Sequence, residues 1–468
     1  MAILPGMPAR VRDHHLFPTR DDLRGLVGLA VPVVVVNLGM MLMGVVSTVM
    51  VGHVSAADLA ASALGNLYFV MLVLLGWGTL MALDPIVAQA VGARDQPAVA
   101  RAVQRGLVLA AGLGVLTALG FLPARAVLGF LRQPADVVPL AARYAEVSIA
   151  GVFPFLAFVV LRQSLQAMGR MRPIVLVILA ANLLNAALGW VFIFGRLGCP
   201  PLGAVGAGLA ATVSRFGMAL GLLALGWHEL RPLLRPLRRE SLDRAALARM
   251  LRLGVPIGAQ MQLEYGIFAV VALLMGRLGT VPMAAHQIAM TIASVTFMVP
   301  QGIGGAAAVL VGQAVGAGEA SRARRAAATS LGLGAGFMLL SGLVFVVIPG
   351  PLARLFSAEA PVLAVAIMLL PIAAVFQVFD GIQVVSIGVL RGVGDTRTPV
   401  VVNVLGFWLI GLPLSLWLGF GLRAGAAGLW WGLVVGLVVV GLILLVRVRV
   451  RLRRSLTRLA VDEVAEAV

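Results

Sequence analysis

Long apolar stretches separated by short polar or charged segments make up most of the chain. A helix needs about 20 mostly apolar residues to cross a bilayer, and each stretch is near that length. Short segments that alternate polar and apolar residues do not recur, which favours helices over a membrane barrel. The pattern predicts about twelve transmembrane helices, at residues 26–51, 62–91, 106–130, 138–164, 174–195, 204–227, 253–276, 284–316, 327–350, 361–390, 399–420 and 425–446.

The second half of the chain repeats the first. LAVPVVV at 29–35 corresponds to LGVPIGA at 253–259, and QAVGA at 89–93 recurs as QAVGA at 313–317, both at an offset of 224 residues. A register held through loops indicates two homologous halves of six helices each. An even number of spans per half gives both halves the same orientation, so we predict two lobes related by a pseudo-two-fold axis along the membrane normal.

One long charged segment, HELRPLLRPLRRESLDRAALARM, separates the two halves. Such an interruption between apolar spans indicates a boundary. We therefore predict two six-helix lobes, an N-terminal one at 26–227 and a C-terminal one at 251–446. The parts outside the lobes are predicted to be cytoplasmic: an N-terminal segment (1–25), a linker (228–250) and a tail (447–468).

Composition agrees with an all-α polytopic membrane protein. Of 468 residues, 61% are hydrophobic and 12% are charged, whereas about a quarter are charged in a soluble protein. The net charge of +17 comes from arginines clustered in alternate loops. By the positive-inside rule this distribution places both termini in the cytoplasm. We expect a multi-pass protein of a bacterial inner membrane in contact with lipid, monomeric, and with no nucleic-acid partner.

The acids that lie deep inside predicted spans are Glu264, Asp380 and Asp84. Glu146 also falls within the range 138–164, but it lies close to a membrane surface beside Arg143 and is interpreted as a surface charge. A charged acid near the bilayer centre costs roughly 2.5–3.5 kcal/mol, so it is a functional hypothesis by default. Scaffold residues recur in both halves, so residues that break the symmetry are the better candidates. The counterparts of the three deep acids in the other half are all apolar: Met40, Phe155 and Ala308.

Glu264 and Asp380 are the predicted site for a coupling cation. Carboxylates in an apolar setting can take up a proton or hold a cation, and both processes couple transport to an ion gradient. If the ion is Na⁺, these two residues are its predicted ligands. Asp84 directly precedes Pro85 near the cytoplasmic end of its span, where water or a helix break could satisfy it, so structural and functional interpretations both stay open.

Other polar residues near the acids are candidates for a cation or substrate site. Gln377 and Gln383 flank Asp380, Tyr265 follows Glu264, and Gln287 lies in the next span. No Walker A sequence is present, so ATP does not drive this protein directly. The histidines are too dispersed for a metal centre, so we expect neither an enzyme nor a cofactor.

The N-terminal half contains the segments LAVP (29–32), TVMVGHV (48–54) and PIVAQAVGA (85–93). The C-terminal half contains GVPIGAQMQLEYGIFAVVALL (254–274), AAHQIA (284–289) and VFQVFDGIQVVSIGVLRGVGDTRTP (375–399). In these segments the sequence resembles the multidrug and toxic compound extrusion (MATE) family, in its NorM-type branch. The match covers about residues 25–446. It implies a V-shaped pair of six-helix lobes that exports organic cations and hydrophobic drugs against inward Na⁺ or H⁺.

The resemblance also assigns residues. Acids of the seventh and tenth spans form the coupling site in NorM-like proteins, and Glu264 and Asp380 match them. The first span departs from the family, because GVVSTVMVG places Ser47 where NorM-type members commonly have Asp. This puts proton coupling in the N-terminal lobe in doubt and leaves Asp84 as a possible substitute. Asn182 and Asn185 match the Asn-bearing fifth span and could line the cavity or bridge helices.

Our interpretation is a cation-coupled multidrug antiporter that works by alternating access, with drug-like cations as its small-molecule partners. The alternative is a lipid-linked oligosaccharide flippase of the same wider superfamily. A flippase favours an arginine-lined cavity for a pyrophosphate, and only Arg162 and Arg215, inside or near spans, support it.

Overall fold

The computed structural model describes residues 19–131 and 133–461. The first 18 residues of the predicted N-terminal segment and residues 462–468 of the predicted tail lie outside the described residues. Within the described part, 12 helices are long and apolar enough to cross a membrane, and no strand is present. The predicted all-helical, twelve-span fold is confirmed.

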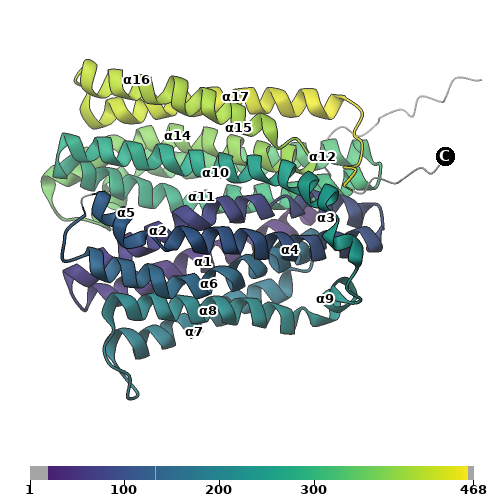
Figure 1. Cartoon of the computed structure of the whole chain (residues 1–468). Helices are drawn as coiled ribbons and strands as arrows, with labels where there is room; N and C mark the ends of the chain where they lie inside the picture. Colours follow the sequence, from purple (N-terminus) through teal and green to yellow (C-terminus); the bar gives the residue numbers. More distant parts are fainter. Residues whose placement is uncertain (1–18, 132, 462–468) are drawn as a thin grey trace, which may run out of the picture.

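The N-terminal lobe, here called the N-lobe, comprises α1 to α8 (Figure 1). Its helices are α1 Arg20–Gly52, α2 Ala56–Leu80, α3 Leu83–Gly92, α4 Gln96–Phe121, α5 Ala124–Phe130, α6 Val138–Ala167, α7 Met171–Phe194 and α8 Gly203–Leu225. Helices α2 and α3 form one continuous span, Ala56–Gly92. The predicted third span is divided between α4 and α5 at Pro123, where the proline removes a backbone donor.

The C-terminal lobe, here called the C-lobe, comprises α10 to α17 and lies above the N-lobe in Figure 1. Its helices are α10 Arg244–Leu278, α11 Thr280–Gly316, α12 Ala320–Val347, α13 Pro349–Arg354, α14 Ala360–Gly392, α15 Arg397–Asn403, α16 Leu412–Leu416 and α17 Gly425–Arg453. The eleventh span also contains two π-helical segments, η2 Val404–Gly411 and η3 Trp417–Gly421. Such segments are rare and are frequent at functional sites.

Several helices begin before their apolar runs. Helix α1 starts at Arg20 because Thr19 and Asp22 form a capping box that satisfies its first N–H groups. Helix α10 starts at Arg244, capped by Asp243, so the predicted linker 228–250 includes the first turns of the seventh span. The linker also contains α9 Trp227–Leu234 and the 3₁₀ turn η1 Arg239–Leu242.

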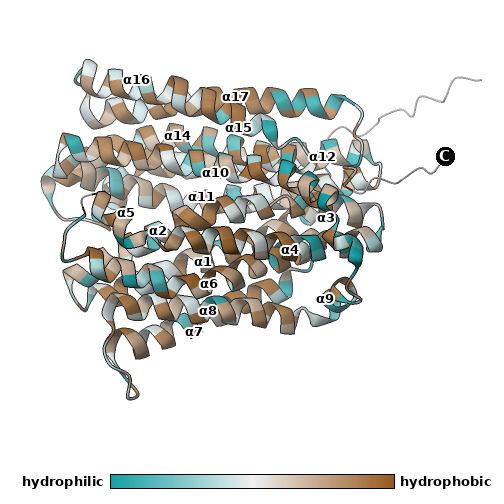
Figure 2. Ribbon diagram, viewed as in Figure 1, coloured by the Kyte–Doolittle hydropathy of each residue, from teal (hydrophilic) through white to brown (hydrophobic). Residues whose placement is uncertain are grey.

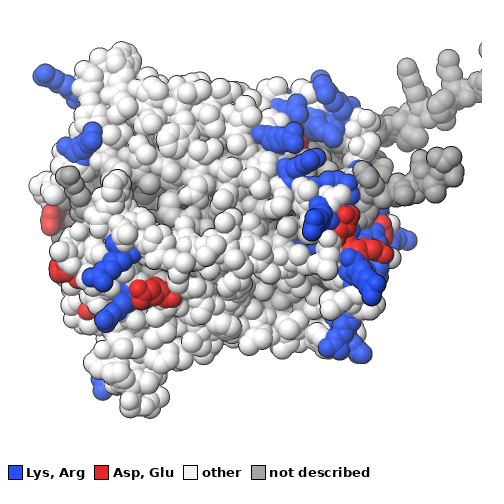
Figure 3. Space-filling model, in the orientation of Figure 1, with Lys and Arg blue, Asp and Glu red and all other residues white. Residues whose placement is uncertain are grey.

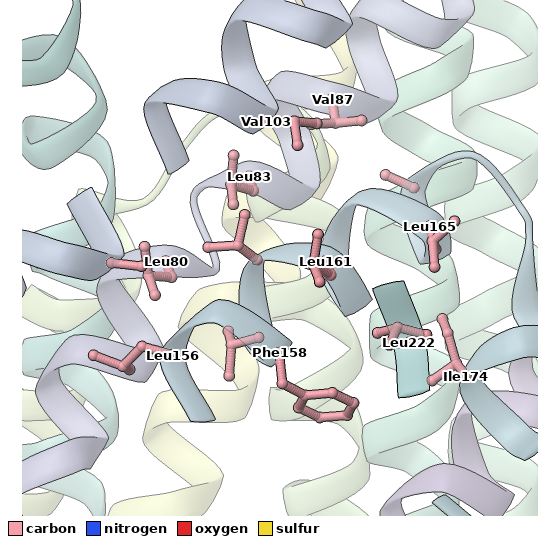
Figure 4. Packing of buried hydrophobic residues seen from close by; sticks show 14 of the residues in the cluster. Leu80, Leu83, Val87, Val103, Leu156, Phe158, Leu161, Leu165, Ile174 and Leu222 are labelled. Carbon is pink, nitrogen blue, oxygen red and sulfur yellow. The ribbon is translucent and has the colours of Figure 1, made fainter. Parts of the chain in front are cut away.

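Each lobe has its own hydrophobic core. The larger cluster is built mainly from α1 to α8, and a second one from α10 to α17. Figure 4 shows part of the N-lobe core, with Leu80 and Leu83 of the second span and Leu156, Phe158 and Leu161 of α6. Separate cores allow the lobes to move as units against one another.

The outer surface is apolar between two charged ends. Exposed leucines such as Leu116, Leu183 and Leu273, which are 64%, 75% and 73% exposed, belong to this band. The ribbon is mostly apolar along the length of the helices (Figure 2). On the face shown in Figure 3, most arginines gather at the right-hand end of the view, where α17 (Gly425–Arg453) ends. We call this end the arginine-rich end.

Small residues let the two lobes approach closely. A Cβ at Gly78 of α2 would lie 2.5 Å from the Cα of Gly258 of α10, and a Cβ at Gly302 of α11 would lie 3.0 Å from the backbone nitrogen of Val34 of α1. Backbones that pass this closely exclude any larger residue. The second span of each lobe therefore packs against the first span of the other.

The lobes are joined by two pseudo-equivalent contacts at the arginine-rich end. Gln89 of α3 donates its side-chain N–H to the carbonyl of Gly392, 2.9 Å away, and Gln313 of α11 donates to the carbonyl of Ala167, 2.8 Å away. A Cβ at Gly92 would overlap the carbonyl of Gln313, and a Cβ at Gly316 would overlap that of Gln89. We call this contact the α3–α11 crossing. It closes the space between the lobes at this end.

The C-terminal tail adds a second connection between the lobes. Arg458 lies 2.9 Å from the Asp95 carboxylate of the N-lobe, and the backbone N–H of Leu459 donates to the side-chain oxygen of Gln89 at 2.8 Å. Arg249 of α10 donates to the carbonyl of Val461 at 2.8 Å. The tail therefore runs from α17 across the closed end to the N-lobe.

Candidate functional site

A cavity of about 400 Å³ lies between α10, α11 and α14 of the C-lobe. Glu264 and Tyr265 reach it from α10, and Asp380 and Arg391 reach it from α14. The volume is in the range of small-molecule sites, and apolar residues form most of the wall. The structure thus brings the two predicted coupling acids to one cavity, which sequence spacing alone does not show.

The Glu264 carboxylate accepts three hydrogen bonds from neutral amides. Gln383 of α14 donates to Oε1 at 2.9 Å, while Gln260 and Asn403 donate to Oε2 at 3.0 Å and 3.2 Å. An ionised carboxylate only accepts hydrogen bonds, so three donors match its charged form. Helices α10, α14 and α15 therefore hold this side chain in one position.

Asp380 is buried and less well satisfied. Its side chain is 8% exposed, and within residues 19–131 and 133–461 it has no hydrogen-bond donor or ion-pair partner. A buried carboxylate without a partner is costly unless it is protonated or binds a cation. Asp380 is thus the acid of this cavity whose environment most requires an incoming positive charge.

Two amide oxygens near the acids also lack donors among the described residues. They are Oε1 of Gln383 and Oδ1 of Asn403, which belong to two of the three amides that donate to Glu264. Carboxylate and amide oxygens are ligands suited to hard cations. No group of three or more His, Cys, Asp or Glu side chains that could hold a metal ion occurs in the described part of the chain. The two carboxylates and the two free amide oxygens can accept a cation or a proton.

Asp84 lies outside this cavity, at the boundary between the lobes. It is fully buried, and its Oδ2 lies 3.5 Å from Nη1 of Arg391 of the C-lobe. Arg162 shares a cavity of about 320 Å³ with Asp84 and donates to Asn37 at 2.9 Å. The structure therefore gives Asp84 an inter-lobe ion pair, which favours the structural interpretation of this acid.

A second cavity, of about 390 Å³, lies inside the N-lobe. Ser47 and Asn185 both line it, and Asn185 donates to the Ser47 hydroxyl at 2.9 Å. Its only charged lining residue in the described chain is Arg215 of α8. The N-lobe cavity therefore has a charge opposite to that of the acidic C-lobe cavity.

The remaining candidates lie elsewhere. Asn182 donates to the carbonyls of Gly39 and Ile178, both at 2.9 Å, and so bridges α1 and α7. Gln377 is buried and accepts from Thr296 at 3.0 Å. Gln287 is exposed and lines a separate surface pocket. Tyr265 alone of the other candidates on α10 and α11 lines the C-lobe cavity.

Sequence reasoning missed three residues of the site. Gln260 lies four residues before Glu264, a spacing that places both on one helix face and was a usable signal. Asn403 carries no such signal, because its contact needs α15 to pack beside α10. Arg391 lies one residue beyond the predicted tenth span, 361–390, and in the structure it is 9% exposed in the last turn of α14, inside the protein.

The sequence model of the MatE family matches residues 32–191 and 256–417, two segments that begin 224 residues apart, as the internal repeat does. The chain belongs to the MatE family. Members of this family are transporters and not enzymes, so this is a multi-pass membrane transporter. The predicted family is confirmed.

Relatives of this MatE protein align over nearly its whole length. It is 36% identical over 456 residues to the probable multidrug resistance protein NorM of Pseudomonas putida, with 96% of this chain and 98% of the relative covered. It is 33% identical to the multidrug resistance protein MdtK of Edwardsiella ictaluri, with 92% and 95% covered.

Solved structures share the fold. The Vibrio cholerae MATE transporter VcmN in its bent form is 21% identical, with a TM-score of 0.82 over 92% of this chain and 97% of that one. A multidrug resistance MATE family transporter in an outward-facing conformation is 19% identical, with a TM-score of 0.84 over 95% and 99%. These likenesses support the two-lobed fold.

Proposed function

We propose that this MatE protein exports organic cations and hydrophobic drugs in exchange for an inward-moving cation, Na⁺ or H⁺. The single observation that carries this proposal is the pair of carboxylates, Glu264 and Asp380, in one cavity of about 400 Å³. The names of its relatives support multidrug substrates. The coupling ion and the exchange are inferred from the site.

Competition for the two carboxylates is the proposed basis of coupling. A drug cation or a coupling cation neutralises the same charge, so binding of one disfavours binding of the other. When the site is empty, the charge of Asp380 is buried without a partner among the described residues. This uncompensated charge disfavours the change of the empty protein from one conformation to the other. Exchange is favoured because the protein changes between its two conformations at low free-energy cost only when a cation neutralises the site.

The surrounding cavity suits flat apolar cations. Tyr265, Phe268 and Phe376 contribute aromatic rings to its wall. Rings of this kind attract cations through their faces, particularly where water is excluded. The acids supply the charge and the rings supply apolar contact, without a fixed hydrogen-bonding pattern that would select one compound.

We also propose that the arginine-rich end faces the cytoplasm of a bacterial cell, in its inner membrane. The concentration of arginine at that end supports this orientation by the positive-inside rule. The α3–α11 crossing then closes the cytoplasmic side, and the conformation described is the one that releases substrate outward.

The test is ethidium transport by proteoliposomes under an imposed Na⁺ gradient and, separately, an imposed pH gradient. The parent protein is compared with Glu264→Gln and with Glu146→Gln, a matched change at an exposed acid. Transport driven by one gradient, lost in Glu264→Gln and kept in Glu146→Gln, is the expected result and identifies the ion. Equal driven transport in Glu264→Gln and the parent would remove this acid from coupling.

A further inference from the structure

Arg215 of α8 is a cation inside a membrane span, and it has no counter-ion among the described residues. Its side chain is 8% exposed and lines the N-lobe cavity. No hydrogen bond or ion pair joins its guanidinium to any residue in 19–131 or 133–461, and its Nη1 is buried without an acceptor. Guanidinium groups inside membrane proteins are normally paired. This one therefore requires an anion that the described residues do not supply.

Neighbouring residues fix the orientation of this guanidinium. Its central carbon lies 3.5 Å above the ring of Phe69, a cation–π contact. Gly151 of α6 makes room for it, because a Cβ there would lie 3.0 Å from Nη1. The planar group is held between α2, α6 and α8, and such a preorganised fork matches a carboxylate.

The rest of the N-lobe cavity suits an anion equally well. Among the described lining residues none is acidic. The other polar lining residues carry neutral hydroxyl or amide groups, and they are Ser47, Thr48, Ser62, Asn66, Tyr144 and Asn185. In a cavity of low polarity, one cation and several neutral donors favour a single negative group. A purely cationic ligand would be repelled there.

The N-lobe and C-lobe cavities adjoin one another. Leu74 lines both cavities. The cavity of Asp84 and Arg162 lies between them, because it shares Trp77 with the N-lobe cavity and Met261 with the C-lobe cavity. A ligand in this region meets the unpaired Arg215 on the N-lobe side. On the C-lobe side it meets two carboxylates and Arg391, whose charge is paired with Asp84. The two lobes are therefore complementary to a molecule that carries both charges.

We propose that the N-lobe cavity is an anion subsite in which Arg215 binds a carboxylate of dipolar substrates. The proposal rests on the drug-export function proposed above and adds to it a binding site for the negative group of a substrate. The cationic part of such a molecule faces the C-lobe, and its carboxylate pairs with Arg215. Binding then satisfies the orphaned guanidinium, which a simple cation does not.

Tetramethylrhodamine and its methyl ester test the proposal, because they differ only in the free carboxylate. Binding to purified protein in nanodiscs is followed by fluorescence anisotropy for the parent, Arg215→Gln and Arg215→Lys. Arg143→Gln, at an exposed arginine of the same lobe, is the matched control. We expect Arg215→Gln to weaken binding of the carboxylate dye by about tenfold or more, and to leave the ester unchanged. Arg215→Lys keeps the charge and loses the forked geometry of the guanidinium. Its affinity for the carboxylate dye is expected to lie between those of the parent and Arg215→Gln.

Retained binding of the ester shows that each variant is folded. Equal effects of Arg215→Gln on both dyes, or no effect on either, would overturn the proposal. If the parent binds the ester and not the carboxylate dye, the anion subsite is refuted and cation export stands. If it binds neither dye and does not transport ethidium, both proposals are refuted.

Discussion

Placing a methyl group at the α3–α11 crossing should open the arginine-rich end. An alanine Cβ at Gly92 would lie 2.7 Å from the carbonyl carbon of Gln313 and 2.8 Å from its Cα, whereas ordinary contacts begin at 3.4 Å. The same substitution at Gly316 meets the backbone of Gln89 at 2.6 Å and 2.7 Å. Both obstacles are backbone atoms, so no change of rotamer relieves them and the helices must separate.

The expected cost follows from overpacking. Forcing a methyl group into a packed contact typically costs about 1–3 kcal/mol. Since 1.4 kcal/mol is a factor of ten in an equilibrium constant, the closed conformation should become about 5–150-fold less favoured. Alanine also gains about 1 kcal/mol of helix propensity over glycine. Gly336→Ala of α12 controls for that gain, because no atom lies within 4 Å of a Cβ at this exposed position.

Pulsed electron spin resonance measures the outcome. Spin labels on cysteines at Arg172 and Arg397, two exposed and pseudo-equivalent positions, report the separation of the lobes once Cys199 is changed to serine. Gly92→Ala and Gly316→Ala should each shift the distance distribution towards longer values by a similar amount, while Gly336→Ala should not. Distributions that match the parent in both crossing variants would refute the reasoning.

Two further predictions concern ion pairs. Asp84→Asn leaves Arg391 buried without its anion and should destabilise the protein by about 3–5 kcal/mol, measured by thermal unfolding. Adding Arg391→Gln should restore part of the lost stability. Unchanged stability of Asp84→Asn would contradict the role of the pair. Burial raises the pKa of Asp95, but the backbone N–H of Ala98 and the Arg458 guanidinium outweigh it and hold that pKa below its ordinary value. Because the pKa is depressed in the folded protein, attachment of the tail is present at neutral pH and is lost only as the pH falls below about 4. The mobility of a spin label on the exposed tail should be constant from pH 8 to 5 and rise only as the pH falls below about 4. A rise between pH 7 and 5 would contradict the assignment.

The number of spans and the repeat could be predicted because bilayer thickness fixes helix length and because two halves share a register. Helix ends were less predictable. Helix α10 starts at Arg244 rather than 253, since the cap of Asp243 satisfies a polar first turn that hydropathy does not detect. The π-helical eleventh span has no hydropathy signal either, because its residues are as apolar as those of an ordinary span.

The acids could be identified as candidates because charge is rare and costly in apolar helices. Their surroundings could not, since Asn403 and Gln383 reach Glu264 from helices more than 100 residues away in the sequence. Arg391 could not be identified as part of the site, because an arginine in the last turn of a span has the same sequence pattern as one in a loop. Whether such an arginine is buried in the protein depends on how the two lobes pack.

The ion pair between Asp84 and Arg391 constrains how charge is redistributed when the lobes move. Rocking open at the arginine-rich end separates a buried anion on one lobe from a buried cation on the other. Arg391 also lines the cavity of Glu264 and Asp380, so the acids of its own lobe share a cavity with it. Under the exchange proposed above, the guanidinium of Arg391 and a diffusing cation would be alternative means of neutralising the same two carboxylates. Separation of the lobes at the arginine-rich end would then release an internal competitor for the cation site.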